Sequence, residues 1–309
     1  MKKFLWIVSI FVYFSGFAKD TPFNFLRYIG SARSSALAGA FVSVSDDPTA
    51  LFFNPASVAT VNSRNFSFTF FKHVLDVNSG SLSYLRNFEK VGHFALSASY
   101  TNYGSFERTN ANGQYIGTFG ANDFALGISY SNILDTNLYY GTTLKIISSN
   151  IDKYSSLAFA IDFGLLYLIP EKNTSVGFSI LHTGTQLKTF DGTRENLPLD
   201  VRIGVSHRLR GLPLLLNFNF YNLADETSKF FDRFLKFSIG GEFNFGDNLN
   251  LRIGYDNNIR KYSASTKDKQ FIGFSGGLGL KFKELNLDYS ISQVGASAIF
   301  HKISLYFQF

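Results

Sequence analysis

The chain has 309 residues, of which 29 are basic and 23 acidic; without Lys2 and Lys3, which belong to an expected leader, the slight excess of positive charge does not indicate nucleic acid binding. It contains no cysteine, which excludes a disulfide framework, a thiol nucleophile and a thiolate metal site. Aromatic side chains are abundant, with 36 Phe and 16 Tyr, while only 17% of the residues are charged. This combination is typical of a membrane β-barrel, in which half of each strand faces hydrocarbon and half faces a polar lumen.

Residues 1–18 have the pattern of a signal peptide. Lys2 and Lys3 precede an apolar run that ends at Phe14. Ser15-Gly16-Phe17-Ala18 follows, with small residues at the two positions that a signal peptidase recognises. The run is shorter than the roughly 18 to 20 apolar residues that a spanning helix needs. We therefore expect cleavage near Ala18 and export to the envelope.

Residues 19–64 alternate too little to form a strand pair, and we expect them to form a hatch inside the barrel. Asp46 or Asp47 is expected to cap a short helix that begins near Pro48, because proline suits a first turn and a carboxylate accepts from free N–H groups there. Arg33 is a candidate ion-pair partner for one of the two. A structural role is favoured over a metal site, because no His lies nearby and two carboxylates alone bind metal weakly.

Residues 65–309 alternate apolar and polar side chains with period two, which predicts an all-β fold, a 14-stranded antiparallel transmembrane β-barrel. The predicted strands centre on residues 66–70, 82–84, 94–100, 124–130, 140–146, 157–165, 176–180, 201–205, 214–220, 235–245, 249–255, 278–282, 285–291 and 303–309. At about 3.3 Å per residue and a tilt near 45°, the 235–245 strand would cover roughly the 25 Å apolar band of such barrels. The last strand carries Phe307 and ends on Phe309, which we interpret as the membrane-assembly signal.

The predicted connections alternate between short turns, placed in the periplasm, and long loops, placed outside the cell. The long loops are residues 103–117, 183–197, 222–230 and 256–270. Aromatic and Arg side chains in two of them are candidate partner-binding residues, because such side chains anchor interfaces. They are Phe106, Arg108, Tyr115, Phe190 and Arg194. The alternative is that they pack into the loop bases or the aromatic girdle.

Charged residues at inward-facing positions are nearly balanced in sign. The basic ones are Lys145, Arg202, Lys236, Arg252, Lys281 and Lys302, and the acidic ones are Asp123, Asp162, Glu242, Asp256 and Asp288. A channel selective for one sign of ion would show a ring of the opposite charge. We therefore expect ion pairs among these residues and with the N-terminal segment, because unpaired burial is costly.

The sequence predicts no catalytic residue, no cofactor and no metal site. Its five His residues are scattered, and none has a recognised spacing. His73 and His182 lie near outer strand ends, and either would become a catalytic candidate within hydrogen-bond reach of both a Ser and a carboxylate. We expect structural or solvated histidines instead.

The N-terminal segment resembles a known family. The run 39–48 followed by 52–56, which includes Asn54 and Pro55, is similar to the hatch motif of FadL-like barrels, a fourteen-stranded family that includes fatty-acid channels and the PorV/PorQ proteins. Further segments at 102–106, 117–126, 197–204 and 295–297 resemble the PorQ branch, and the likeness extends over nearly the whole mature chain.

This resemblance implies a non-catalytic barrel surrounded by the lipid of a Gram-negative outer membrane. Its implied role is in type IX secretion, where it would anchor a PorZ-like surface protein of the cargo attachment complex, together with PorU- and PorV-like proteins. The docking site would be the outer rim. Nucleic acid is not among the implied partners.

The alternative function is a FadL-like transporter of hydrophobic small molecules. In FadL-like channels the ligand leaves the lumen sideways, which requires an apolar pocket or a strand kink near the hatch. Gly240-Gly241 and the glycines of 276–279 would weaken the wall or, more simply, leave room for the hatch. A continuous apolar tunnel behind the hatch would favour transport, and a packed interior would favour the scaffold.

Overall fold

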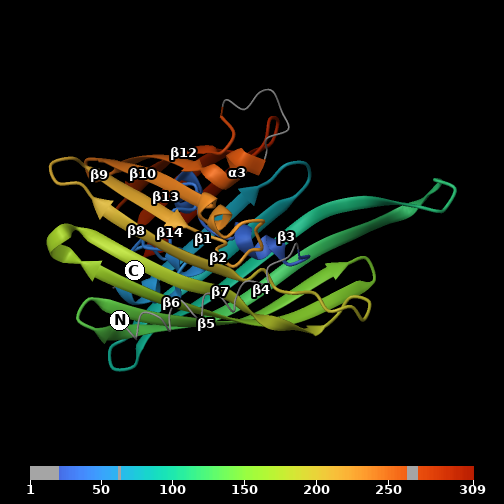
Figure 1. Cartoon of the computed structure of the whole chain (residues 1–309), viewed down its shortest axis with the longest axis horizontal. Helices are drawn as coiled ribbons and strands as arrows, with labels where there is room; N and C mark the ends of the chain where they lie inside the picture. Colours follow the sequence, from blue (N-terminus) through green and yellow to red (C-terminus); the bar gives the residue numbers. More distant parts are fainter. Residues whose placement is uncertain (1–20, 62–63, 263–270) are drawn as a thin grey trace.

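The computed structural model describes residues 21–61, 64–262 and 271–309. Within these ranges, fourteen antiparallel strands form a closed barrel (Figure 1). Each strand pairs with its neighbours in the chain, and β14 (Ile299–Gln308) closes the ring on β1 (Asn65–Lys72), with Phe307 opposite Phe66. The predicted fourteen-stranded antiparallel barrel is confirmed. The predicted signal peptide lies outside the described residues.

The remaining strands follow in chain order around the ring. They are β2 (Asn78–Phe88), β3 (Gly92–Thr109), β4 (Tyr115–Asp135), β5 (Leu138–Ile151), β6 (Tyr154–Ile169), β7 (Thr174–Lys188), β8 (Asp200–Arg208), β9 (Leu214–Phe220), β10 (Phe237–Phe245), β11 (Leu249–Asp256), β12 (Phe274–Phe282) and β13 (Leu285–Gln293). The helices are η1 (Asn24–Tyr28), α2 (Ala32–Ala36), η2 (Ala50–Phe52), η3 (Pro55–Thr60), η4 (Pro170–Lys172), η5 (Phe230–Leu235) and α3 (Asn257–Tyr262). In the described ranges, no helix is both long and apolar enough to cross a bilayer.

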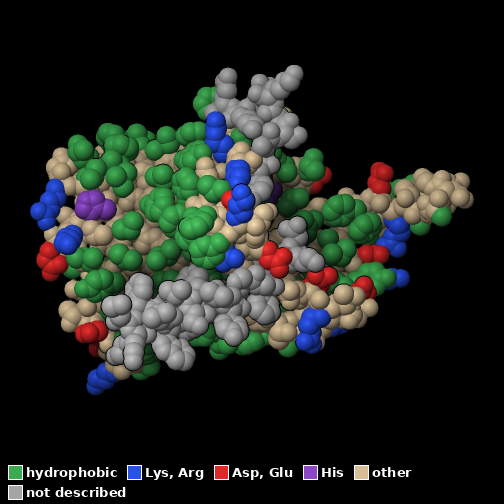
Figure 2. Space-filling view, viewed as in Figure 1, with side chains coloured by type: hydrophobic (Ala, Val, Ile, Leu, Met, Phe, Trp, Pro, Cys, Tyr) green, Lys and Arg blue, Asp and Glu red, His purple; other side chains and the backbone are tan. Residues whose placement is uncertain are grey.

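The strands form because apolar side chains can all point outward and small or polar ones inward. On β4, Leu126 and Ile128 are 43% and 54% exposed, whereas Ala125 and Ser129 are buried. Figure 2 shows hydrophobic side chains over much of the barrel wall. A closed ring leaves no free strand edge, so the backbone polar groups of the wall are paired as a bilayer requires.

The two ends of the barrel differ, as predicted, but β3 and β4 extend further at the outer end than the sequence suggested. Six turns of two to five residues join strands at one end, and β3 and β4 project beyond the other strands at the opposite end (Figure 1). The predicted loop 103–117 is wrong, because most of it continues this hairpin, with Phe106 opposite Phe119. Only residues 110–114 form the turn, where the Asn110 side chain accepts from two backbone N–H groups.

Residue 235 is a second correction. The strand predicted for 235–245 begins at Phe237, and Leu235 ends the short helix η5. The sequence still alternates from η5 into β10, because Leu235, although helical, is exposed like the outward-facing residues of the strand. The alternation of apolar residues alone therefore does not show where the strand begins.

Residues 21–61 pack against the inward-facing side chains of the barrel. The Ser275 hydroxyl donates to the carbonyl of Ala36 at 3.0 Å, and the Ser175 hydroxyl donates to the carbonyl of Ser43 at 2.6 Å. Helix α2 contacts β11 to β14, while η3 contacts β3 to β6. The segment thus reaches both sides of the lumen.

Wall glycines allow the segment to approach the backbone of β6 and β7. A Cβ added at Gly164 would lie 2.0 Å from Asn54 Oδ1, and one added at Gly177 would lie 2.1 Å from the Val42 carbonyl oxygen. In that space, Asn54 Nδ2 donates to the carbonyls of Val42 at 2.8 Å and Leu165 at 2.9 Å. The Asn-Pro pair singled out in the sequence therefore holds the segment against the wall.

Candidate functional site

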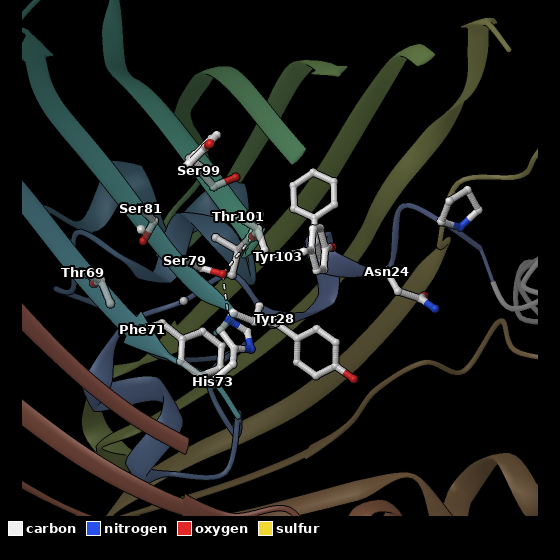
Figure 3. Close-up of a pocket in the computed structure, with 17 residues that line it drawn as sticks. Asn24, Tyr28, Thr69, Phe71, His73, Ser79, Ser81, Ser99, Thr101 and Tyr103 are labelled. Atoms are coloured by element: carbon white, nitrogen blue, oxygen red, sulfur yellow. Dashed lines mark hydrogen bonds between the residues drawn. The ribbon is translucent and has the colours of Figure 1, made fainter. Parts of the chain in front are cut away.

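A cavity of about 230 Å³ lies between the N-terminal segment and strands β1 to β3 (Figure 3). The lining residues from the segment are Pro22, Asn24, Phe25, Tyr28, Ile29 and Gly30. Those from β1, β2 and the turn between them are Thr69, Phe71, His73, Val77, Ser79, Gly80 and Ser81, and those from β3 are Ser99, Tyr100, Thr101 and Tyr103. The lining is thus aromatic and aliphatic on the segment side, with hydroxyl groups along the strands.

The end of β1 positions an aromatic pair in this cavity. Phe71 faces inward and stacks on His73, with ring centroids 3.4 Å apart. His73 Nε2 lies 2.7 Å from the Ser79 hydroxyl, which in turn lies 2.9 Å from that of Thr101 (Figure 3). Burial and the positive charge of neighbouring lysines lower the pKa of His73 to about 4. The imidazole is therefore neutral at physiological pH and offers a polar contact without charge.

One hydroxyl in the cavity lacks a partner. Ser99 Oγ is buried and makes no hydrogen bond to any residue that the structure describes. Buried polar groups normally have a partner, so an unpaired one facing a cavity indicates a place for a ligand's polar group. An apolar pocket with a few hydroxyls suits a neutral, mainly apolar molecule.

The barrel wall is thin beside the cavity. Gly80 pairs with Phe70 on β1 and Tyr100 on β3, at a position where neighbouring side chains face outward, and it carries no side chain there. The β3–β4 register also shifts between Asn102 and Ser105, which is a bulge. Gly80 and Tyr100 line the cavity, so it reaches the wall beside this glycine.

Two further cavities differ in their chemistry. One of about 350 Å³ shares Tyr28, Ile29 and Phe71 with the first, but charged groups also line it. Another of about 570 Å³ is lined by the charged residues Arg33 and Glu242, among others, and shares no lining residue with the first two. The interior formed by the described residues is therefore not fully packed, and the most apolar of these three cavities lies between the segment and β1 to β3.

Ion pairs link part of the predicted set of charged residues. Asp123 and Asp256 instead accept from the hydroxyls of Tyr103 and Tyr221, and Lys281 is exposed and forms no ion pair with the described residues. Arg33 lies 2.9 Å from Asp47 and 2.8 Å from Glu242, and Arg252 bridges Glu242 at 2.5 Å and Asp288 at 2.7 Å. Further pairs are Lys145–Asp162, Arg202–Asp200 and Lys236–Asp225. Lys302 differs, because its ammonium donates to the carbonyl of Tyr28 at 3.0 Å and lies over the Phe71 ring.

The residues predicted as structural in the N-terminal segment have different surroundings. Asp47 accepts from the backbone N–H of Thr49 at 2.7 Å, but the turn that follows is the short 3₁₀ helix η2 rather than an α-helix starting at Pro48. Asp46 is exposed and has a positive φ of 56°. Asn54 caps η3, whose first residue is Pro55, by accepting from the Ala56 N–H.

The predicted outer residues fall into two groups. Phe106, Arg108 and Tyr115 stand in strands β3 and β4 rather than in a loop. Phe190 is half-buried and Arg194 exposed in the connection 189–199. Phe307 and Phe309, predicted as the membrane-assembly signal, lie where β14 meets β1. The Phe309 N–H donates to the carbonyl of Arg64 at 2.9 Å.

The cavity residues were missed by the sequence analysis, although His73 was named there. Ser99 and Thr101 look like any other small residues at inward positions of a barrel strand. The available signals were a His after an apolar strand and a glycine, Gly80, at an outward position. Neither shows a cavity until the segment is placed beside them.

The histidines do not form a catalytic arrangement in the described chain. His73 meets Ser79, but the charged groups that act on it are lysines rather than a carboxylate. His182 lies 3.8 Å from Asp162 and 3.3 Å from Lys145. Among the described residues, no group of three His, Asp or Glu side chains is arranged to hold a metal ion.

Comparison with known proteins places the fold. No protein-family model and no curated protein matches the chain. Among solved structures, the toluene transporter TodX of Pseudomonas putida is 12% identical with a TM-score of 0.62, covering 90% of this chain and 98% of that one. The toluene transporter TbuX of Ralstonia pickettii is 14% identical with a TM-score of 0.57, at the same coverage. A FadL homologue of Pseudomonas aeruginosa is 13% identical with a TM-score of 0.54, covering 95% and 99%.

Identities this low carry the fold alone. The narrower likeness to PorV and PorQ stays a prediction from the sequence. The chain therefore has the fold of the FadL-like barrels of the Gram-negative outer membrane.

Proposed function

We propose that this barrel carries small hydrophobic molecules across the outer membrane, with residues 21–61 acting as its hatch. The observation that carries the proposal is the apolar cavity between that segment and β1 to β3, with the unpaired Ser99 hydroxyl inside it. The toluene transporters that share its fold support the same class of function.

The cavity size favours a single-ring substrate. An apolar cavity of roughly 150 Å³ holds benzene, and the cavity here has about 230 Å³. The neutral His73 and the hydroxyls beside it would receive one polar substituent. A carboxylate is less suitable, because no lysine or arginine is among the described residues that line the cavity.

The proposed exit is sideways through the wall. The cavity of about 570 Å³ is lined by the Arg33–Glu242 ion pair. An apolar ligand there would displace water from these charges without offering them hydrogen bonds, so its binding would be unfavourable. The thin wall at Gly80 and the bulge at Tyr103-Gly104 lie beside the apolar cavity instead. The ligand would leave there into the membrane.

Filling the cavity tests this function. Ser99→Leu places a larger side chain inside it, and uptake of labelled toluene by cells should fall about tenfold or more, the scale on which a pocket rejects an excess methylene group. Ala98→Leu adds the same bulk on the outer face of β3 and should leave uptake unchanged. Equal uptake by the two variants at equal surface amounts would rule the cavity out as the route.

Anchoring of a type IX surface protein is a second candidate, and the outer hairpin favours it. Phe106 stacks on Phe119 with ring centroids 5.4 Å apart, and the Arg108 guanidinium lies over the Phe119 ring. Phe106 is 42% exposed and lies on β3 beyond the register shift between Asn102 and Ser105. Exposed aromatic and Arg side chains of this kind serve as interface anchors.

Surface attachment of exported cargo separates the two candidates. In a strain lacking the gene, wild-type protein and the Ser99→Leu variant should both restore attachment if the scaffold function holds, whereas Phe106→Ala should not. Ala111→Ser at the hairpin tip is the control. Attachment that is normal without the gene would leave only the transport function.

A further inference from the structure

Four large apolar side chains stand exposed on η5, in the connection between β9 and β10. Phe230, Phe231, Phe234 and Leu235 are 58%, 77%, 40% and 36% exposed, whereas Arg233 among them is buried. Single exposed apolar residues are common, but a contiguous group indicates an interaction surface. The helix therefore has one uncovered apolar side that the barrel itself does not use.

This side continues the outward-facing surface of the barrel. The Phe234 ring packs edge-on against Phe220 at 5.5 Å, and Phe220 packs against Phe218 at 4.9 Å; both partners belong to β9. The ring contacts then run across the neighbouring strands as Phe218–Phe237, Phe237–Tyr255 and Tyr255–Phe274. Such a row is the aromatic girdle at the membrane boundary.

The connection also folds onto the outside of the wall nearby. Val201 points outward on β8 but is buried, in a cluster with Leu199 and Leu223. The backbone N–H of Leu223 donates to the Val201 carbonyl at 3.1 Å. The loop is thus attached to the lipid side of the barrel.

The strands at this place are too short to fill the apolar layer. From Phe237 to Phe245, β10 rises about 20 Å along the membrane normal at a tilt near 40°, against about 25 Å for the apolar band of such barrels. Strand β9 is shorter still, with 7 residues. Helix η5 stands at the outer end of β10, opposite the short turn 246–248.

We propose that η5 lies in the outer leaflet of the membrane, with its four exposed apolar side chains among lipid acyl chains. The helix completes the apolar band where β9 and β10 end early. The occupant of the surface is the lipid itself, because the surface is continuous with the wall that lipid already covers. A protein partner or a second copy would require a free surface that faces away from that wall.

Fluorescence gives a direct test, since Trp6 is the only tryptophan in the sequence. In a Trp6→Phe background, Phe231→Trp places one fluorophore on η5. Ile239→Trp places one deeper on the outer face of β10, and Tyr115→Trp places one on the projecting hairpin. The folded proteins are reconstituted into phosphatidylcholine bilayers that carry bromine atoms at a shallow or a deep position of the acyl chains.

The Phe231→Trp protein should show blue-shifted emission and lose roughly half its intensity to shallow bromines, because an interfacial helix buries its apolar face about 5–10 Å into the acyl boundary. The Ile239→Trp protein should respond more to deep bromines, and the Tyr115→Trp protein to neither. Unquenched emission at position 231 would overturn the proposal. Red-shifted emission would mean exposure to water, and blue-shifted emission would mean a cover of protein.

Discussion

Replacing Arg33 by methionine is expected to lower the free energy of unfolding by about 3–5 kcal/mol, the cost of breaking a buried ion pair from one side. The Arg33 guanidinium joins Asp47 of the segment to Glu242 of the wall. Both carboxylates are almost fully buried, so water does not replace the guanidinium. Urea unfolding in lipid vesicles, followed by circular dichroism, measures the change.

An exposed pair provides the matched control. Arg108 and Asp152 also form an ion pair, but their side chains are 40% and 30% exposed. Arg108→Met should therefore cost no more than about 1 kcal/mol. Adding Asp47→Asn to Arg33→Met should recover part of the loss, because Asp47 loses its ion-pair partner in that variant, whereas Glu242 keeps Arg252. Equal losses for the two single variants would contradict the buried network.

Enlarging Gly164 is expected to displace residues 21–61 from the wall. A Cβ at this position would lie 2.0 Å from Asn54 Oδ1 and 2.8 Å from Pro55 Cδ, so Gly164→Val has no room without movement. Overpacking costs about 1–3 kcal/mol, and each of the two Asn54 bonds that would be lost adds about 1 kcal/mol. We expect lower stability and increased entry of a polar antibiotic into cells.

Gly241 is the control for this substitution. It stands on the outer face of β10, where an added Cβ would meet only Leu214, Leu216 and Ile253, at 3.6 Å or more. Gly241→Val should leave the unfolding free energy and antibiotic entry near those of the wild type. If Gly164→Val behaved in the same way, the segment would not be held by the Asn54 contacts.

The wall could be predicted from the sequence because the membrane imposes one rule on it. Lipid requires apolar side chains at every second position, and Phe124, Leu126 and Ile128 on β4 satisfy that rule. This requirement applies only to the part of each strand that faces lipid. Residues 105–109 of β3 lie beyond it, so their mixed composition resembled a loop although they pair with β4.

The candidate site was harder to predict because it is made by contacts between distant segments. Phe25 and Ser99 face the same cavity from the N-terminal segment and β3, and no local pattern relates them. The Arg33–Asp47 pair, by contrast, was suggested by the sequence because both residues belong to one short polar segment. Its further link to Glu242 depends on the curvature of the closed sheet.

The seam between β1 and β14 determines the order in which the molecule can be made. The final residue, Phe309, bonds to the backbone of Arg64, just before β1 begins, so the cylinder is sealed only when the last strand has been delivered. Residues 21–61 bond to hydroxyls on well-separated strands, such as Ser175 on β7 and Ser275 on β12, so this set of bonds is complete only once the sheet has curved round the segment.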